Sequence, residues 1–425
     1  MSRKPRGSVL FALIVSVALA VAAGVGLRAF DTQVSFSHGP TGYRGIVAAN
    51  FYSADAGEEI IGDFGTTGVW LYHHFSQWVR LTWDNPEWIF AVKFDSTVDS
   101  ELVADFGSLG LWLWDCCSAA YSGTWTRLTS ANPENAIAVD DDWDGREELE
   151  VDFGTLGLWR YDHDTYVWSR LSALDPVGSG LRTDLWDVGW QEGLWNFGDV
   201  GLWLVFWDEG TYVVGPYWQQ ISPASADDRA AGNFVDSSGT GPQEELAVEF
   251  PGLGVWQFDS SRTWVQLTAS SVQAMVPAKF GDSTDTEVMV ADSSYTPWCW
   301  WGGSTWERLS YTPLETGFLV PYEADYLASG EPASEQELVG DFGAAGLWEY
   351  NYIAQGGQIG VWRRLSAANP VFMVAADHWG DGRQTTAVVN FGPGVGLWIW
   401  YGGEGFYTPF WTKMTDAVPD SNMSW

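Results

Sequence analysis

Short runs in which apolar and polar residues alternate, separated by glycine-containing turns, recur along most of this chain. Such alternation over five to seven residues predicts β-strands, because successive side chains of a strand point to opposite sides. In the clearest stretch the runs are residues 135–139, 148–153, 157–161 and 166–171. Glycine interrupts the chain too often for any helix of useful length. The pattern therefore predicts an all-β protein.

A signature of the form Asp-Phe-Gly-x-x-Gly-Leu-Trp joins the second run to the third, and it is best preserved at residues 152–159. Equivalent blocks, some of which match the signature only in part, end 42 to 53 residues apart at Trp70, Trp112, Trp159, Trp203, Trp256, Trp298, Trp348 and Trp398. Units of this length with four short strands match the blades of a β-propeller. We predict eight blades over residues 45–418 and a tail at 419–425. Seven blades with a decayed edge unit is the alternative.

Each unit carries a second tryptophan on its fourth run, as in the pair Trp159 and Trp168. Because the two indoles recur at equivalent places, we expect them to fill the wedge between neighbouring blades. The first and last units both contain four runs. Ring closure is therefore expected to depend on packing between blades, without a strand borrowed from the other terminus.

Charge narrows the range of partners. Lys and Arg number 20 against 55 Asp and Glu, which gives a formal net charge of -35. Nucleic acid is an improbable partner, because phosphate binding needs a basic surface. An acidic surface suits a cation-rich exterior, although it also serves simple solubility.

The first thirty residues differ from the rest of the chain. Basic residues at the start precede an uncharged run over residues 7–27, and Ala20-Val21-Ala22 offers a cleavage pattern. Residues 1–30 are expected to be a signal peptide or an N-terminal membrane anchor, followed by a linker over residues 31–44. The protein is accordingly expected to be secreted or periplasmic, with the anchor as an open possibility.

Three cysteines are too few for a disulfide framework. Cys116 and Cys117 are adjacent at the end of a predicted strand, and Cys299 lies at a similar place in the sixth unit. We expect free or buried thiols, with a vicinal bridge as the alternative.

One loop has the composition of a metal site. It reads Asp140-x-Asp142-x-Asp144-Gly145-x-x-Glu148, between the first and second runs of the third unit. Alternate oxygen ligands on a turn, with glycine at the bend, are what a hard cation such as calcium requires. The competing interpretation is a solvated acidic hairpin.

The loop and the following Glu148-Leu149-x-Val151-Asp152-Phe153-Gly154 resemble the FG-GAP/VCBS type of repeat. That resemblance implies a calcium-bearing propeller of the kind found in integrin α-chains and secreted bacterial proteins. It implies Asp140, Asp142, Asp144 and Glu148 as ligands, together with the main-chain carbonyl of Arg146. It also implies adhesion or ligand recognition. The loop is complete in the third unit alone.

Four further tryptophans lie in loops between first and second runs: Trp143, Trp186, Trp190 and Trp379. Exposed indoles on a common rim, beside polar side chains, are suited to stacking on sugar rings. We therefore expect these residues to bind carbohydrate, unless they cap the inner strands.

No catalytic motif is found in the sequence. The combined prediction is an exported, non-catalytic binding or adhesion propeller, with a glycan or extracellular protein as partner and calcium as a structural ion. One alternative is a carbohydrate-active enzyme with two carboxylates at the central channel. Another is a component of a surface assembly, for which Trp83, Trp88 and Trp425 could form exposed apolar strips.

Overall fold

The structure is a computed structural model, and its described part is confined to one compact unit of the chain. It describes residues 45–52, 57–73, 77–95, 97, 99–116, 122–142, 144–185, 191–208, 215–234, 244–279, 287–301, 305–315, 319–322, 336–351, 360–378, 385–402 and 410–419. The chain divides into Met1–Gln33 and Val34–Trp425, and every described residue belongs to the second unit. The expected signal peptide or anchor and the linker lie outside the described residues. Within these ranges no helix is long and apolar enough to cross a membrane.

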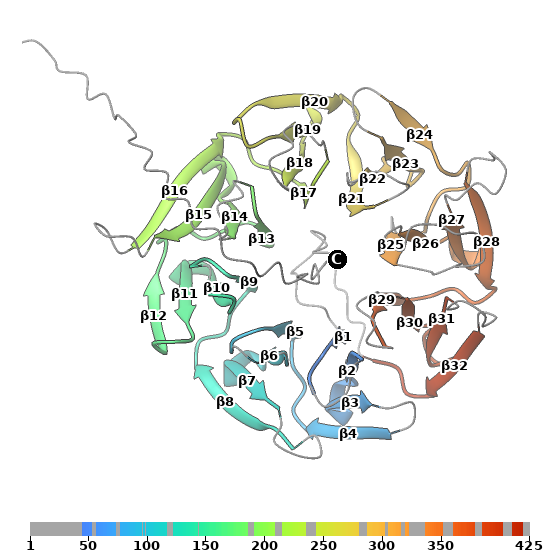
Figure 1. Ribbon diagram of the computed structural model, residues 1–425, viewed down its shortest axis with the longest axis horizontal. Coiled ribbons are helices and arrows are strands. Elements are labelled where there is room, and N and C mark those ends of the chain that lie inside the picture. Colours follow the sequence, from blue (N-terminus) through green and yellow to red (C-terminus); the bar gives the residue numbers. More distant parts are fainter. Residues whose placement is uncertain are drawn as a thin grey trace, which may run out of the picture. The chain divides into compact units, whose positions relative to one another are not determined.

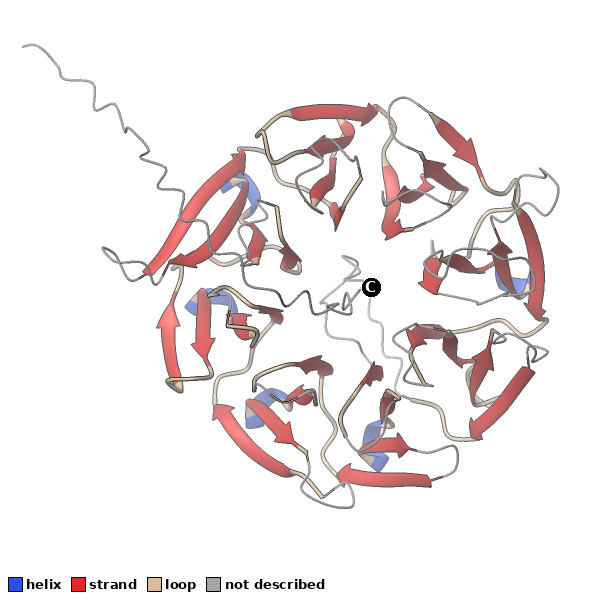
Figure 2. Cartoon of the chain, in the orientation of Figure 1, coloured by secondary structure: helices blue, strands red, loops and turns tan. Residues whose placement is uncertain are grey.

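Eight four-stranded antiparallel sheets make up the described chain, and each takes four consecutive strands. Figure 1 shows the first strand of each sheet nearest the centre of a ring and the fourth strand on its rim. Figure 2 shows how little besides strands and connecting turns the ring contains. The predicted all-β propeller with eight blades is confirmed, and the seven-blade alternative is wrong.

The strands of blades 1 to 4 are β1 (Ile46–Ala49), β2 (Glu59–Asp63), β3 (Val69–His73), β4 (Gln77–Thr82), β5 (Trp88–Val92), β6 (Glu101–Asp105), β7 (Leu111–Asp115), β8 (Thr124–Thr129), β9 (Asn135–Val139), β10 (Glu148–Asp152), β11 (Leu158–Asp162), β12 (Val167–Arg170), β13 (Leu181–Thr183), β14 (Glu192–Asn196), β15 (Leu202–Asp208) and β16 (Gly215–Ser222). Those of blades 5 to 8 are β17 (Asp228–Gly232), β18 (Glu245–Phe250), β19 (Gly254–Phe258), β20 (Trp264–Thr268), β21 (Val272–Ala278), β22 (Glu287–Asp292), β23 (Pro297–Trp300), β24 (Trp306–Arg308), β25 (Leu319–Tyr322), β26 (Glu337–Asp341), β27 (Leu347–Asn351), β28 (Val361–Ser366), β29 (Phe372–Ala376), β30 (Thr386–Asn390), β31 (Leu397–Tyr401) and β32 (Phe410–Thr415).

The repeated signature builds the turn between the second and third strands. In blade 3, Asp152 Oδ1 accepts a hydrogen bond from the Gly154 N–H at 2.8 Å. This bond starts a 3₁₀ turn, η3 (Gly154–Leu156). Gly157 follows with φ of +84°, and a Cβ there would lie 2.3 Å from the Ser172 carbonyl oxygen, so no other residue fits. Trp159 Nε1 then donates to the Leu156 carbonyl at 3.1 Å.

These turns and the linkers between blades lie at the same end of the strands. The end of a fourth strand pairs with the start of the third, as in Thr82 with Val69, and the start of a first strand pairs with the end of the second, as in Ile46 with Gly62. We call this end of the ring the turn face. The loops between first and second strands emerge at the opposite end, which we call the loop face.

The hydrophobic core is divided into layers between neighbouring blades. One buried cluster joins Phe90 and Leu111 of blade 2 to Leu149 and Phe153 of blade 3. Each of the other clusters likewise draws on two adjacent blades. The cluster that contains Ile60 joins blade 1 to blade 8. Ring closure by packing, as expected, is therefore confirmed.

The second tryptophan of most blades forms a hydrogen bond to the preceding blade. Trp168 Nε1 donates to the Leu128 carbonyl of blade 2 at 3.2 Å. The same bond to the preceding blade recurs at Trp78, Trp125, Trp264, Trp306, Trp362 and Trp411. The signature tryptophans differ, because they stay half-buried and bond within their own blade, as Trp159 does.

Neighbouring blades are also joined on the loop face by a repeated pair of hydrogen bonds, which we call the junction clasp. It links the residue just before a second strand to the residue just after the first strand of the preceding blade. Between blades 1 and 8, the Glu58 N–H donates to the Asp377 carbonyl at 2.7 Å, and the Asp377 N–H donates to Glu58 Oε2 at 2.6 Å. The same reciprocal pair joins Glu147 to Lys93, Gln191 to Asp140, Glu244 to Asp184 and Gln336 to Lys279.

Two expectations about single residues need correction. Cys116 is disulfide-bonded, with its partner outside the described residues, so the expectation of free thiols holds only for the buried Cys299. Trp88 is 3% exposed, because it packs between blades 2 and 3, and it forms no surface strip. Trp83 is 65% exposed, as the assembly alternative required. Trp425 lies outside the described residues.

The junction clasp predicts a specific effect at the ring closure. Glu58→Ala should lower the free energy of unfolding by about 1–2 kcal/mol, because the Asp377 N–H loses its acceptor. Glu58→Gln should cost much less, since Gln191 and Gln336 already serve in other clasps. Chemical denaturation of the three proteins compares these values. An equal loss in both variants would show that the charge of Glu58, not the clasp, matters.

Candidate functional site

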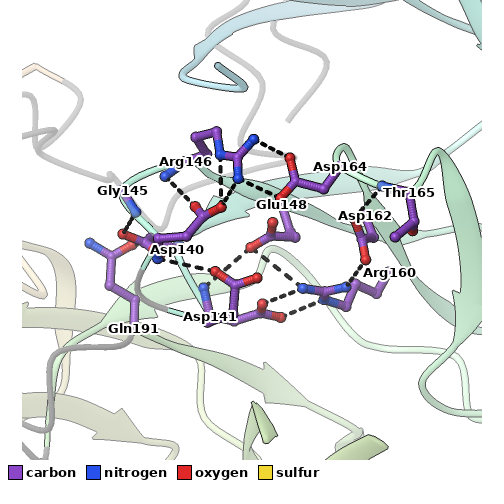
Figure 3. A network of polar contacts seen from close by, with 12 residues as sticks. Asp140, Asp141, Gly145, Arg146, Glu148, Arg160, Asp162, Asp164, Thr165 and Gln191 are labelled. Carbon is purple, nitrogen blue, oxygen red and sulfur yellow. Dashed lines mark hydrogen bonds and ion pairs between the residues drawn. The ribbon is translucent and has the colours of Figure 1, made fainter. Parts of the chain in front are cut away.

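The acidic loop of blade 3 is curled by its own side chains (Figure 3). Asp140 Oδ2 accepts the Gly145 N–H at 3.1 Å, and Asp142 Oδ1 accepts the Asp144 N–H at 3.2 Å. Gly145 has φ of +84°, which glycine adopts without strain. Oxygen atoms of the three aspartates lie within 4.8 Å of one another. The loop therefore brings Asp140, Asp142 and Asp144 together at the loop face.

This oxygen set fits a hard divalent cation, but a basic side chain also uses part of it. The guanidinium of Arg146 pairs with the carboxylates of Asp144 and Asp164. Burial raises the pKa of Asp144, yet the hydrogen bonds from Arg146 outweigh burial and lower it. The carboxylate therefore stays charged and able to act as a ligand, while a cation would compete with Arg146 for it.

Glu148 is placed differently from the three aspartates. Its carboxylate points into the blade, where Oε2 accepts the Asp141 N–H at 3.4 Å and lies 3.6 Å from Arg160 Nη2. It belongs to a second group of neighbouring carboxylates, with Asp141 and Asp142, and Asp142 is common to this group and to the group of the three aspartates. The carbonyl of Arg146 stays a predicted ligand.

Comparison with other blades explains why Glu148 turns inward. In blades 1 to 7 the first residue of the second strand is a buried glutamate, and in several of them it accepts the N–H of a residue that follows the first strand. This bond joins Glu59 to Phe51, Glu101 to Phe94, Glu192 to Leu185 and Glu245 to Phe234. Burial raises the pKa of Glu101 and of Glu192 to about 8. The sequence already contained a signal for this structural role, because a glutamate recurs at this position. The role was missed in blade 3 because Glu148 also fits the metal-binding motif.

Beneath the loop lies a buried ion pair that the sequence reading missed. Arg160 on β11 is 1% exposed, and its Nε and Nη2 donate to both oxygens of Asp141 at 2.7 and 2.5 Å. Its Nη1 lies 3.3 Å from Asp162 Oδ2, and its guanidinium lies 4.7 Å from the Trp207 ring centroid. Figure 3 shows this network directly under the acidic loop. The base of the candidate metal site is thus fixed by charge-assisted hydrogen bonds.

Blade 3 differs from blades 1 and 4 at both positions of this pair. Blade 1 has Phe51 and Leu71 there, and blade 4 has Leu185 and Leu204, all of them buried. An arginine at a position that is leucine in blades 1, 2 and 4 was a signal in the sequence. The ion pair itself could not be predicted, because its partner Asp141 is 19 positions away and only the fold brings the two side chains together.

The four tryptophans expected to bind carbohydrate, Trp143, Trp186, Trp190 and Trp379, lie outside the described residues. Their role stays a prediction. Nearby described residues are those of the junction clasp, such as Gln191, whose N–H donates to the Asp140 carbonyl at 2.8 Å.

The buried ion pair predicts non-additive effects of substitution. Arg160→Leu should lower the free energy of unfolding by about 3–5 kcal/mol, because Asp141 is left buried without its partner. Adding Asp141→Leu, which reproduces the apolar pair of blade 4, should recover most of that loss. Chemical denaturation of both single variants and the double variant measures the coupling. A double variant no more stable than Arg160→Leu would contradict this account.

No protein-family model matches the sequence, including the FG-GAP/VCBS type, and no curated protein matches it. The BP39L lectin from Burkholderia pseudomallei is similar in structure, with a TM-score of 0.47 and 12% identity over 88% of this chain and 98% of the lectin. BBS1N chains in complex with ARL6DN give 0.45 over 79% and 96% in a mercury-soaked crystal, and 0.43 over 77% and 94% in a lead-soaked one, both at 12% identity. These similarities concern the fold alone.

Proposed function

We propose that this chain is an exported, non-catalytic binding propeller that presents its surface to a glycan or an extracellular protein. The observation that supports this proposal is a constant frame with variable loops. The junction clasp fixes the two ends of the loops between first and second strands in blade after blade. Between those ends the connection runs over residues 93–100 in blade 2 but over residues 323–336 in blade 7.

A rigid frame with loops of different length is a common design for binding, because sequence can change in the loops without loss of the fold. The net charge of -35 argues against nucleic acid as the ligand. Export is supported by the apolar segment and cleavage pattern at the start of the sequence.

We further propose that the loop of blade 3 binds calcium as a structural ion. Asp140, Asp142 and Asp144 would supply carboxylate oxygens, which already lie within 4.8 Å of one another. A bound calcium ion would neutralise the repulsion among these carboxylates and stiffen the loop. Asp140 connects this loop to blade 4 through its clasp with Gln191, so stiffening would extend to a blade junction.

Calcium should therefore stabilise the folded protein. At a concentration of about one hundred times its dissociation constant, calcium should add about 2.7 kcal/mol to the free energy of unfolding. Asp142→Asn keeps an oxygen for the Asp144 N–H and should abolish this gain. Calorimetric unfolding with calcium and with chelator measures it. Asp199→Asn, at an exposed position in η4 (Gly198–Val200), is the matched control and should respond like the unsubstituted protein.

The binding role is tested with the purified propeller against panels of soluble polysaccharides and of extracellular proteins, by isothermal titration calorimetry. A saturable ligand in either panel is expected. Turnover of a polysaccharide during the titration, detected as new reducing ends, would instead favour the carbohydrate-active enzyme. Absence of any ligand would contradict the proposed function.

A further inference from the structure

A polar side chain recurs at one exposed position on the outer strand of every blade, opposite the signature tryptophan. The cross-strand pairs are Trp70 with Arg80, Trp112 with Arg127, Trp159 with Arg170, Trp203 with Gln220, Trp256 with Gln266, Trp298 with Arg308, Trp348 with Arg364 and Trp398 with Lys413. This one position holds six of the chain's 20 basic residues, which is notable in so acidic a protein. Each pair lies near the turn face.

In four blades the basic side chain at this position bonds to another group of the protein. The Nε of Arg127, Arg170 and Arg364 donates to the carbonyl oxygen two residues further on, at 3.3, 3.2 and 3.3 Å. In blade 8, Lys413 pairs with Asp416. In these blades the residue three positions after the cation is small or acidic: Ser130, Ala173, Ala367 and Asp416.

Blades 1 and 6 differ, because an aromatic residue stands near the same cation. The Arg80 guanidinium carbon lies 3.2 Å from the centroid of Trp83 and 5.2 Å from that of Trp70. In blade 6 the Arg308 carbon lies 4.8 Å from the centroid of Tyr311 and 4.6 Å from that of Trp298. Each arginine therefore contacts two aromatic rings.

The outer ring of each stack is open to solvent. Trp83 is 65% exposed and Tyr311 is 88% exposed. Within the described part of the chain neither arginine makes an ion pair with a carboxylate. Both stacks thus present an exposed aromatic ring that is backed by a guanidinium.

We propose that Trp83 with Arg80, and Tyr311 with Arg308, are two equivalent binding platforms for neutral hexopyranose rings of a polysaccharide. This inference depends on the proposed binding function and names its ligand class and its place on the turn face. A sugar ring stacks its C–H face on the open face of the aromatic ring, while the guanidinium covers the other face. The underlying stack restrains the ring before binding, which reduces the entropy cost of association.

Charge decides between neutral and acidic polysaccharides. The formal charge of -35 repels a polyanion over distances of about a Debye length, whereas a neutral chain approaches without that barrier. Two arginines cannot reverse a field of that size. The surroundings of Trp83 are themselves acidic, since the exposed Asp84 is the next residue.

The test titrates the propeller with neutral glucans, mannan and xylan, and with polygalacturonate as the charged counterpart. We expect a neutral polysaccharide to bind. Trp83→Ala and Tyr311→Ala should each weaken binding about tenfold, the scale of one lost aromatic stack, and the double variant should abolish it. Trp83→Tyr should retain binding, because tyrosine already serves in blade 6.

The matched control is Tyr166→Asn. Tyr166 is 71% exposed but lies in the β11–β12 hairpin, away from both stacks, and its φ of 58° is one that asparagine tolerates. This variant should bind like the unsubstituted protein. Melting temperatures of all variants should agree, because the substituted side chains are exposed.

Three results would overturn the inference. Undiminished binding in the double variant would remove the platforms but leave the proposed binding function intact. Preference for polygalacturonate would remove the neutral ligand class. If no neutral polysaccharide in the panel binds, the platforms are excluded as sugar sites, and the proposed function then depends on the extracellular proteins.

Discussion

Contact between neighbouring blades is the constraint on which the rest of this protein depends. A four-stranded sheet exposes two large faces, and here both are buried against adjacent blades in layers such as the one that joins Phe90 to Phe153. The junction clasp adds hydrogen bonds at one edge of the layers. These bonds satisfy main-chain N–H and carbonyl groups at the ends of the loops, which would otherwise lack a partner within the protein. Because blade 1 meets blade 8 through the same clasp and a similar apolar layer, no strand has to be exchanged to close the ring.

Many of the carboxylates in this acidic chain serve the interior rather than the surface. Glutamates such as Glu101 and Glu192 accept main-chain N–H groups at the start of the second strand, and aspartates such as Asp152 do the same at its end. Burial without a cation raises the pKa of these groups. Blade 3 adds Arg160 to this scheme, and its guanidinium gives the buried Asp141 a charged partner directly beneath the candidate calcium loop.

The two ends of the ring have different chemistry. The loop face has the clasps and the three aspartates of blade 3, which suit a cation and a framework for variable loops. The turn face has tight glycine turns, which leave little room for variation. There, the residue three positions after the exposed arginine varies between blades, and it is Trp83 in blade 1, Ser130 in blade 2 and Tyr311 in blade 6. Arg127, with Ser130 at this place, bonds to the main chain, whereas Arg80, with Trp83 there, lies over an exposed ring.

The sequence by itself determined the strands and the turns, and it favoured eight blades over seven. Each depends on contacts between residues close in the chain: alternation within a strand, Asp152 with Gly154, and Trp159 with Leu156. Repetition made that local pattern clear, although the incomplete copies left seven blades as an alternative. The sequence also located the three aspartates, since an Asx-rich turn is a local structure. Only the tertiary structure decided that Glu148 faces inward, that Arg160 meets Asp141, and that Trp88 is buried while Trp83 is exposed. The free energy of a side chain differs between water and the interface of two blades. Whether a given side chain is buried there depends on the neighbouring blade, and not on the residues next to it in the sequence.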